Sequence, residues 1–521
     1  MTDHLLLKNA RLPEKKDLLT ISITNGAIIA IQPTKESAGA NYYDLDGAFV
    51  LPGMCDAHLH LEMLSIRLSA IDCELPSKRD CLAAVAKAAE QADDDSWLIG
   101  FNWNHNVWQP AEYGTAEDLD RVSANHPVLL YAKSMHASWA NSKALQAAGI
   151  NQSTPDPVGG QILRDESGNP TGILLENAMQ LAEAANPPLT TQEPAEKMLA
   201  TQSYLHSLGL TSVHDFDRFE SLEALELLAS RGLLTLDVTK NLPAEAIDRI
   251  IRSDYRDHLS RHGLTPGWIK GFADGALGPQ SAAMLEPYEN SVSKGMLLLK
   301  AAEILELGIK AAQAGWPLAI HAIGDAANHE VLEGYARLRE AERHEKLPHL
   351  PHRIEHAQCL HPHDFTRFKQ FGVIASVQPI HAVSDRQMAL RNWGGRIPFA
   401  YAYRSLEEAG ATMVFGTDAP VEPADPFLGL RAAVDRPSEE PSILPEGWPI
   451  SQSVTLSTAL HAYAQAPALL TGRKNIGKIE PGYLANLITL PVDPFQCDPA
   501  QLGELKPLQT YVRGRLVYDS L

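Results

Sequence analysis

Two histidines that could bind one metal ion follow a Pro-Gly turn near the start of the chain. In "LPGMCDAHLHLEM", residues 51–63, His58 and His60 interrupt a stretch that otherwise has the apolar character of a buried strand. Residues i and i+2 of a strand point to the same face, so the two imidazoles would lie side by side. Taken alone, this spacing favours two hydrogen-bonded core histidines over a pair of metal ligands.

Further residues that can bind a metal lie at the ends of later apolar stretches. His321 ends "PLAIH", His356 ends "RIEH" and Asp418 ends "VFGTD". Lys270 lies inside a fourth such stretch, "WIKGFADGALG". Aspartate and lysine are almost never fully buried without a partner. Histidines that only fill a core would not require further metal-binding residues at the ends of other strands. The whole set therefore favours a metal site.

The stretches that carry these residues recur in a regular order. From about residue 190, amphipathic segments that end at glycine alternate with short apolar strands. With the first stretch there are eight strands: "CDAHLHLEM", "LTSVHDF", "LTLDVTK", "GWIKGFADG", "PLAIHAIGD", "PHRIEHAQ", "GVIASVQPIHA" and "ATMVFGTDAP". Eight strand-helix units predict an α/β fold, a TIM-like (β/α)₈ barrel over residues 51–474, with its chemistry at the carboxyl ends of the strands.

The two ends of the chain have short β patterns in place of this strand-helix alternation. Short β patterns fill residues 1–50, with a tight hairpin turn at Asn25-Gly26, and they return in "GKIEPGYLANLITLPV" and "LQTYVRGRLVY". We therefore predict one small β-sandwich domain built from residues 1–50 and 475–521.

A long insertion, residues 75–190, separates the first two barrel strands. It contains four of the eight tryptophans and a predicted hairpin that turns at Ser167-Gly168-Asn169. Insertions after barrel strands usually shape the mouth of the active site. A packed subdomain with a tryptophan core is the other interpretation, and the two are compatible.

Composition excludes several classes of partner. The formal net charge of −20 argues against nucleic acid or an anionic membrane, since both are polyanions. The five cysteines are scattered and lack C-x-x-C spacing, which favours a reducing compartment over a disulfide framework. The N-terminus does not have the pattern of a signal peptide, and no apolar run reaches the roughly 18 residues of a membrane span. We expect a cytoplasmic protein.

The ligand order resembles that of a known superfamily. The order H-x-H, Lys, His, His, Asp on strands one, four, five, six and eight resembles the amidohydrolase superfamily over nearly the whole chain. Further motifs resemble a branch of metal-dependent hydrolases that includes N-substituted formamide deformylase. These motifs are "GFNWNHNVW", "YAKSMHASWANSKAL", "GILLENA", "FADGALG", "HAIGDAA", "RIEHAQ", "QPIHA" and "FGTDAPVEP".

The resemblance implies a centre with one or two divalent ions. It assigns His58, His60 and Asp418 to the more buried ion, and His321 and His356 to the second. Zinc is the expected metal, because imidazole and carboxylate ligands with open positions suit it.

The resemblance also implies a modified lysine. Lys270 would be carbamylated (N6-carboxylated) by CO₂, which turns a cation into a carboxylate that bridges both ions. The residues alone leave open another role for Lys270, a salt bridge to Asp274. A single-metal site would still be possible in that case.

Four other residues are candidates for substrate binding. His381 in "QPIHA" could bind the substrate or polarise its carbonyl, or it could make a local structural hydrogen bond. His136 and Trp103 could line the pocket from the insertion. Glu176, at the end of "GILLE", could reach the site or be a surface or capping acid.

These features predict a metal-dependent hydrolase that cleaves a C–N bond of a small molecule, such as an amide or formamide, with a metal-activated water. Asp418 would take a proton from that water and pass it to the leaving nitrogen. The tryptophan-rich insertion suggests an apolar or aromatic substrate group. A single-metal deaminase, an esterase or lactonase on the same barrel, and a catalytically silent scaffold stay open, as do the substrate and the oligomeric state, a homodimer included.

Overall fold

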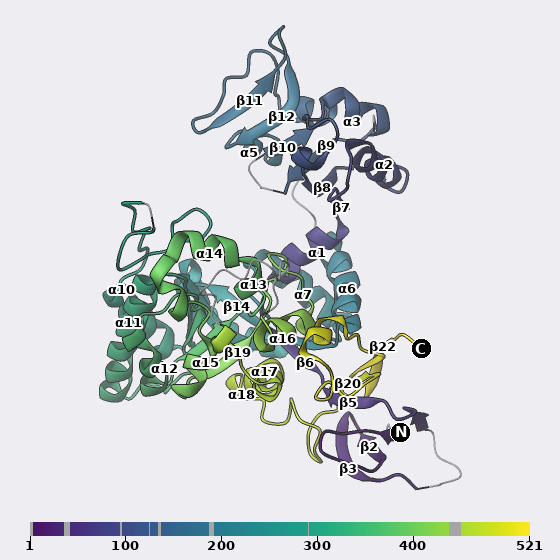
Figure 1. Ribbon diagram of the computed structural model, residues 1–521, viewed down its shortest axis with the longest axis vertical. Helices are drawn as coiled ribbons and strands as arrows, with labels where there is room; N and C mark the ends of the chain where they lie inside the picture. The colour runs from purple at the N-terminus through teal and green to yellow at the C-terminus, as the bar shows by residue number, and fades with distance from the viewer. Residues whose placement is uncertain are drawn as a thin grey trace. The chain divides into compact units, whose positions relative to one another are not determined.

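The computed structural model describes residues 4–35, 42–93, 96–123, 125–133, 137–186, 192–289, 291–436 and 450–521. The chain forms two compact units: residues 1–64 with 198–521, and residues 65–197 (Figure 1). The second unit contains the predicted insertion 75–190 and extends beyond it at both ends. The terminal strands fall into the same unit as the barrel, because β5 runs into the first barrel strand through Gly53.

Eight parallel strands form the central sheet of the first unit, in the order β19-β18-β17-β16-β15-β14-β13-β6. They are β6 (Met54–Leu59), β13 (Leu210–Asp215), β14 (Asp237–Pro243), β15 (Thr265–Phe272), β16 (Leu318–Ala322), β17 (Arg353–His356), β18 (Ile374–Val377) and β19 (Thr412–Phe415). Each of the eight predicted stretches overlaps one of these strands, which confirms the TIM-like barrel.

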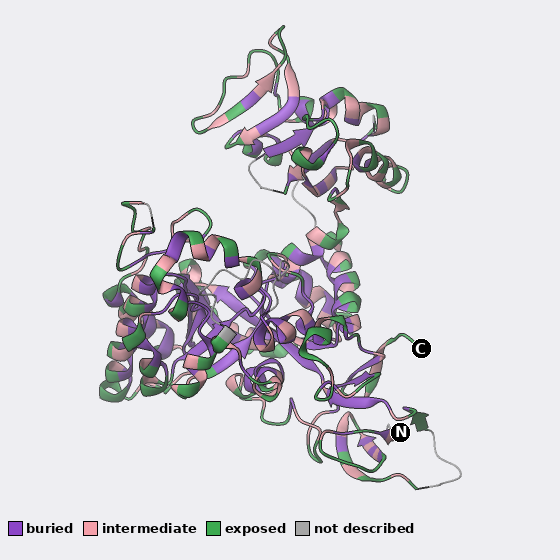
Figure 2. Ribbon diagram, in the orientation of Figure 1, coloured by how far each residue is buried: buried purple, intermediate pink, exposed green. Residues whose placement is uncertain are grey.

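Helices follow the strands and carry exposed residues on their outer faces, while the strands are almost wholly buried (Figure 2). Burial on both faces explains why these strands appear as continuous apolar runs in the sequence. The helices are α1 (Leu61–Ser69), α6 (Gln192–Ser207), α7 (Glu220–Ser230), α8 (Ile247–Arg252), α9 (Tyr255–Arg261), α10 (Ala301–Gln313), α11 (Asp325–Glu345), α12 (Phe365–Phe371), α13 (His381–Ser384), α14 (Arg386–Trp393), α15 (Tyr403–Glu408), α16 (Pro426–Val434), α17 (Leu456–Tyr463) and α18 (Gln465–Leu470).

The chain that leaves β19 hydrogen-bonds to the end of β6. The backbone nitrogen of Asp418 donates to the carbonyl of His58 at 2.6 Å, and that of His60 donates to the carbonyl of Ala419 at 2.8 Å. These bonds join the last barrel strand to the first at the carboxyl end. Barrel closure therefore places the H-x-H pair beside Asp418.

Gly416 allows this close approach of β19 to β6. A Cβ atom at residue 416 would lie 2.4 Å from the backbone nitrogen of His58 and 2.8 Å from Oδ1 of Asp56. We expect Gly416→Ala to lower the free energy of unfolding by about 1–3 kcal/mol, the usual cost of overpacking. Urea denaturation measures the loss. Gly395→Ala is the control, because nothing lies within 4 Å of its added Cβ, and equal stability of the two variants would contradict the prediction.

Two four-stranded sheets come from the ends of the chain. One has the order β3-β2-β1-β4 and the other β22-β21-β20-β5, and both chain ends lie at these sheets (Figure 1). The strands are β1 (His4–Ala10), β2 (Leu19–Thr24), β3 (Ala27–Pro33), β4 (Tyr42–Asp44), β5 (Phe49–Pro52), β20 (Leu487–Leu490), β21 (Gln509–Val512) and β22 (Arg515–Asp519). Leu7, Ile21, Leu487 and Tyr511 belong to one apolar core that the two sheets share. That they form a separate sandwich domain stays a prediction.

The second unit has its own six-stranded sheet, in the order β11-β12-β10-β9-β8-β7. Its elements are β7 (Ile71–Asp72), α2 (Lys78–Ala89), β8 (Leu98–Trp103), α3 (Ala116–Ser123), β9 (Val128–Ala132), β10 (Ala137–Ala140), α4 (Ser142–Ala147), β11 (Gly160–Arg164), β12 (Pro170–Glu176) and α5 (Met179–Glu183). Trp103, Trp108 and Trp139 lie in one apolar core, as the packed-subdomain interpretation expects. Across the described residues of both units, no helix is long and apolar enough to cross a membrane.

Candidate metal centre

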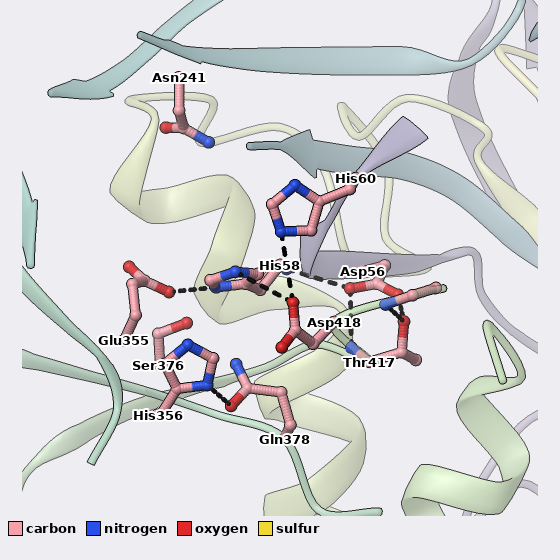
Figure 3. A network of polar contacts seen from close by, with 12 residues as sticks. Asp56, His58, His60, Asn241, Glu355, His356, Ser376, Gln378, Thr417 and Asp418 are labelled. Carbon is pink, nitrogen blue, oxygen red and sulfur yellow. Dashed lines mark hydrogen bonds and ion pairs between the residues drawn. The ribbon is translucent and has the colours of Figure 1, made fainter. Parts of the chain in front are cut away.

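The six predicted ligands lie at the carboxyl ends of five barrel strands. His58 and His60 are at the end of β6, Lys270 is in β15, His321 is in β16, His356 ends β17 and Asp418 follows β19. The ring centroid of His356 lies 5.1 Å from that of His58 and 4.5 Å from that of His321. The barrel thus brings together side chains that are up to 360 residues apart in the sequence (Figure 3).

His58, His60 and Asp418 form the first group with metal-ligand spacing, since their ligand atoms all lie within 4.8 Å of one another. Oδ1 of Asp418 is 3.5 Å from Nε2 of His58 and 3.4 Å from Nε2 of His60. The Nδ1 atoms face outward, to Oε2 of Glu355 at 2.6 Å and to Oδ1 of Asp217 at 3.4 Å. An ionised carboxylate only accepts, so Glu355 and Asp217 hold a proton on each Nδ1, which leaves Nε2 as the nitrogen of each ring that would bind a metal.

His356, His381 and Asp418 form a second such group. Nδ1 of His356 lies 2.9 Å from Oε1 of Gln378, and Nδ1 of His381 lies 3.1 Å from Oε1 of Glu422. Nε2 of His381 is 3.6 Å from Oδ2 of Asp418. The carboxylate of Asp418 therefore belongs to both groups, and His381, which we predicted as a substrate-binding residue, has the spacing of a ligand.

His321 is oriented differently from the other histidines. Its Nε2 lies 3.0 Å from the carbonyl oxygen of Gly275, to which it donates, so its Nδ1 is the nitrogen with a free lone pair. Burial lowers the pKa of His321 to about 3, and the nearby charge of Lys270 acts in the same direction. The ring is therefore neutral and suited to bind a cation.

Lys270 is buried between aromatic rings. Its Nζ lies 5.1 Å from the ring centroid of Phe216 and 4.8 Å from that of Phe272. Burial lowers the pKa of Lys270 to about 8, although Glu355 and Asp418 act in the opposite direction. Asp274 accepts three backbone N–H groups instead, and among the described residues no ion pair joins it to Lys270; the donors are those of Ala283, Ile323 and Gly324.

The histidines set the charge of Asp418. Burial acts to raise the pKa of this carboxyl, but His58, His381 and His60 hold it well below its usual range. Burial likewise acts to lower the pKa of His60, but hydrogen bonds to Asp217 and Asp418 raise it to about 9. Asp418 is therefore an anion at neutral pH, with cationic or polar groups on both of its oxygens.

A buried ion pair contacts His58, one of the predicted ligands, and it was not predicted from the sequence. Arg353 contacts Glu355 twice, from Nε to Oε1 at 2.5 Å and from Nη2 to Oε2 at 2.8 Å. Arg353 also donates to the carbonyl of Ala57 at 2.7 Å and lies 3.0 Å from Nδ1 of His214. Burial acts to raise the pKa of Glu355, but Arg353 and His58 hold it well below its usual range. The charged pair inside "RIEH" was the available signal, because buried charges require partners.

Asp56 also supports the centre, at the closure of the barrel (Figure 3). Its Oδ1 accepts from the backbone nitrogens of His58 and Thr417, each at 3.0 Å, and its Oδ2 accepts from the hydroxyl of Thr417. Burial raises the pKa of Asp56 to about 7, against these hydrogen bonds. Asp56 thus fixes the backbone of the strand that carries the H-x-H pair.

The remaining predicted residues belong to the second unit. Trp103 is buried and donates from Nε1 to the carbonyl of Leu130 at 2.8 Å, while Glu176 ends β12 and is exposed. Both border a cavity of about 450 Å³ together with His105 and Tyr113. His136 lies outside the described residues.

Comparison with known proteins decides the family. A model described as "Amidohydrolase family" matches residues 42–518. The chain belongs to this family. It is 35% identical over 489 residues to the Bacillus subtilis (strain 168) protein YtcJ, and the match covers 91% of this chain and 90% of the relative. The name of YtcJ assigns it to the amidohydrolases only provisionally. It is 28% identical over 525 residues to the N-substituted formamide deformylase of Arthrobacter pascens, covering 96% of this chain and 94% of the relative.

A solved structure shares the fold of this amidohydrolase. It is an uncharacterized metal-dependent hydrolase from Pyrococcus furiosus, with a TM-score of 0.76 and 29% sequence identity, covering 95% of this chain and 100% of the other. These comparisons confirm the predicted superfamily and make this amidohydrolase a metal-dependent hydrolase.

Proposed function

We propose that this chain hydrolyses a non-peptide C–N bond, that of an amide, a formamide or a related group, in a small molecule. One arrangement carries the proposal: the Nε2 atoms of His58, His60 and His381 face the carboxylate of Asp418, while their Nδ1 atoms are held by outer carboxylates. Such outer partners fix the tautomer of metal-binding histidines. A net charge of −20 supports a small-molecule substrate over a polyanion.

The donor set fits one or two divalent ions, and zinc in particular. His58, His60 and Asp418 would hold one ion, and His356 would hold the second with His321 or His381. Imidazole and carboxylate donors of this kind are those of catalytic zinc sites. When bound, such ions supply a nucleophile at neutral pH and polarise the carbonyl that is attacked.

Lys270 is proposed to be carbamylated. Its position supports this, because burial of an ammonium group is costly, and the lowered pKa of about 8 raises the fraction of the neutral amine that reacts with CO₂. The product is a carboxylate at the same place, which would serve as a ligand between the two groups.

Asp418 would act as the base and then as the acid. Its carboxylate takes a proton from the water that attacks the carbonyl carbon, and it later gives a proton to the nitrogen as the C–N bond breaks. The products are a carboxylic acid and an amine. His381, which lies 3.6 Å from Asp418 and is held by Glu422, is placed to orient this carboxylate.

Exposed apolar side chains that follow the predicted ligands in the sequence support a substrate with an apolar group. Met63, Phe272 and Val421 are 51%, 46% and 67% exposed, and each lies two or three residues beyond a predicted ligand. Small-molecule sites are lined mostly by apolar side chains, with a few polar groups at the reacting bond. We therefore propose N-acyl or N-formyl amines with an alkyl or aromatic substituent as the first substrates to screen.

Metal removal tests the proposed function. Dialysis against a strong chelator should reduce hydrolysis of N-formyl and N-acyl amines to the uncatalysed rate, since no residue here replaces the ion as a source of hydroxide at neutral pH. Zinc or manganese should restore the rate. Elemental analysis of the purified protein should find one or two ions per chain that are absent from the double variant His58→Ala with His60→Ala, which assigns them to the barrel end. Protein that holds no metal there, and that neither metal activates, would instead be a silent scaffold.

A further inference from the structure

A third group of metal-binding side chains lies on the outer helices of the barrel. It consists of Glu226 on α7 and of His258 and His262 at α9, and their ligand atoms all lie within 4.8 Å of one another. Ligand atoms bound tetrahedrally to one zinc ion at about 2.0–2.2 Å lie roughly 3.3–3.6 Å apart. The three side chains would therefore have to bring their ligand atoms closer by about 1 Å, which changes of side-chain rotamer can supply, to share an ion.

The helix itself pairs the two histidines. Residues four apart lie on the same face of a helix, and the ring centroids of His258 and His262 are 4.7 Å apart. Nδ1 of His262 lies 2.9 Å from the carbonyl oxygen of His258 and donates to it, which leaves Nε2 of His262 with a free lone pair. On the other side, Nε2 of His258 contacts the carboxylate of Glu226 directly.

A simple ion pair explains only part of this arrangement. A charged His258 beside Glu226 would account for that contact, and such half-exposed pairs contribute little to stability. It gives no role to Nε2 of His262, which belongs to the same group of ligand atoms. A cation shared by two imidazoles and a carboxylate accounts for all three.

The position of the group separates it from the proposed catalytic centre. His262 precedes β15, which begins at Thr265, so it lies at the amino end of a barrel strand, whereas the catalytic centre is at the carboxyl ends. The amino end of such barrels contributes to stability rather than to catalysis. His262 also borders a cavity of about 310 Å³, which reaches Asp237 and Arg513.

We propose that Glu226, His258 and His262 bind a divalent transition-metal ion, zinc by its donor set, in a site that joins α7 to α9. Two imidazoles and one carboxylate provide three ligands, and water completes the tetrahedron. Because the ion would hold together helices that follow β13 and β14, we expect it to stabilise this side of the barrel without taking part in hydrolysis.

Zinc stoichiometry tests the proposal. Wild-type protein, His262→Ala, His258→Ala and Glu226→Gln are loaded with zinc and dialysed against metal-free buffer, and zinc per chain is measured by mass spectrometry. We expect each variant to hold one equivalent less than wild type. His344→Ala, an exposed histidine of α11, is the matched control and should hold as much as wild type.

Thermal unfolding gives a second readout that does not depend on activity. Zinc added to chelated protein should raise the melting temperature less in His262→Ala and Glu226→Gln than in wild type and His344→Ala. Glu226→Gln keeps the side-chain volume, so it decides the result if His258→Ala fails to fold by circular dichroism. Equal zinc content in wild type and in the folded variants would overturn the proposal, whatever the outcome at the catalytic centre.

Discussion

Asp418→Asn should abolish turnover while the protein stays folded. The amide cannot take a proton from the attacking water, and it removes the negative charge that faces His58, His60 and His381. General acid–base catalysis is worth about 10²–10⁴-fold, so we expect kcat to fall by at least about 10²-fold, and further if metal is lost. The measurement is kcat on the best N-formyl or N-acyl amine from the screen.

The fold should tolerate this change because the backbone contact of Asp418 is retained. Its nitrogen donates to the carbonyl of His58 whichever side chain is present. Circular dichroism and the urea midpoint should be close to those of Asp435→Asn, a control at a partly exposed aspartate paired with Arg431. A folded Asp418→Asn enzyme with near-normal kcat would exclude Asp418 as the base.

The barrel could be predicted from the sequence because its strands are buried on both faces. Stretches such as "PLAIH" and "VFGTD" remain apolar until the strand ends, and the polar residue that follows marks the carboxyl end. His321, His356 and Asp418 were predicted as candidate ligands in this way. This signal is local, because it requires only an apolar run and the polar residue at its end.

The partners of these residues could not be predicted, because they come from distant segments or from loops. Glu355 contacts His58 across 297 positions, and Glu422 contacts His381 from the loop beyond β19. The backbone conformation was also not predicted: His356 and Asp418 have φ of +75° and +63°, a left-handed conformation that is uncommon outside glycine. These turns change the direction of the side chain, so strand alternation alone does not place it.

Glu355→Gln should strongly destabilise the protein, because it breaks the buried ion pair beside the metal centre. It leaves the Arg353 guanidinium buried without its carboxylate, and both side chains are fully buried. Removing one partner of a buried pair costs about 3–5 kcal/mol, so we expect the free energy of unfolding to fall by that amount. Glu340→Gln, at an exposed position of α11, is the control and should leave the urea midpoint unchanged.

Metal affinity separates the two roles of Glu355. As the acceptor of Nδ1 of His58, it fixes the tautomer that leaves Nε2 free, and loss of such a partner weakens metal binding by about 10–100-fold. The double variant Arg353→Met with Glu355→Leu removes both buried charges and should regain much of the stability. It still leaves Nδ1 of His58 without an acceptor, so its zinc affinity, measured by competition with a chelator, should stay low. If zinc affinity instead recovered with stability, Glu355 would support only the fold, and the orientation of His58 would not depend on it.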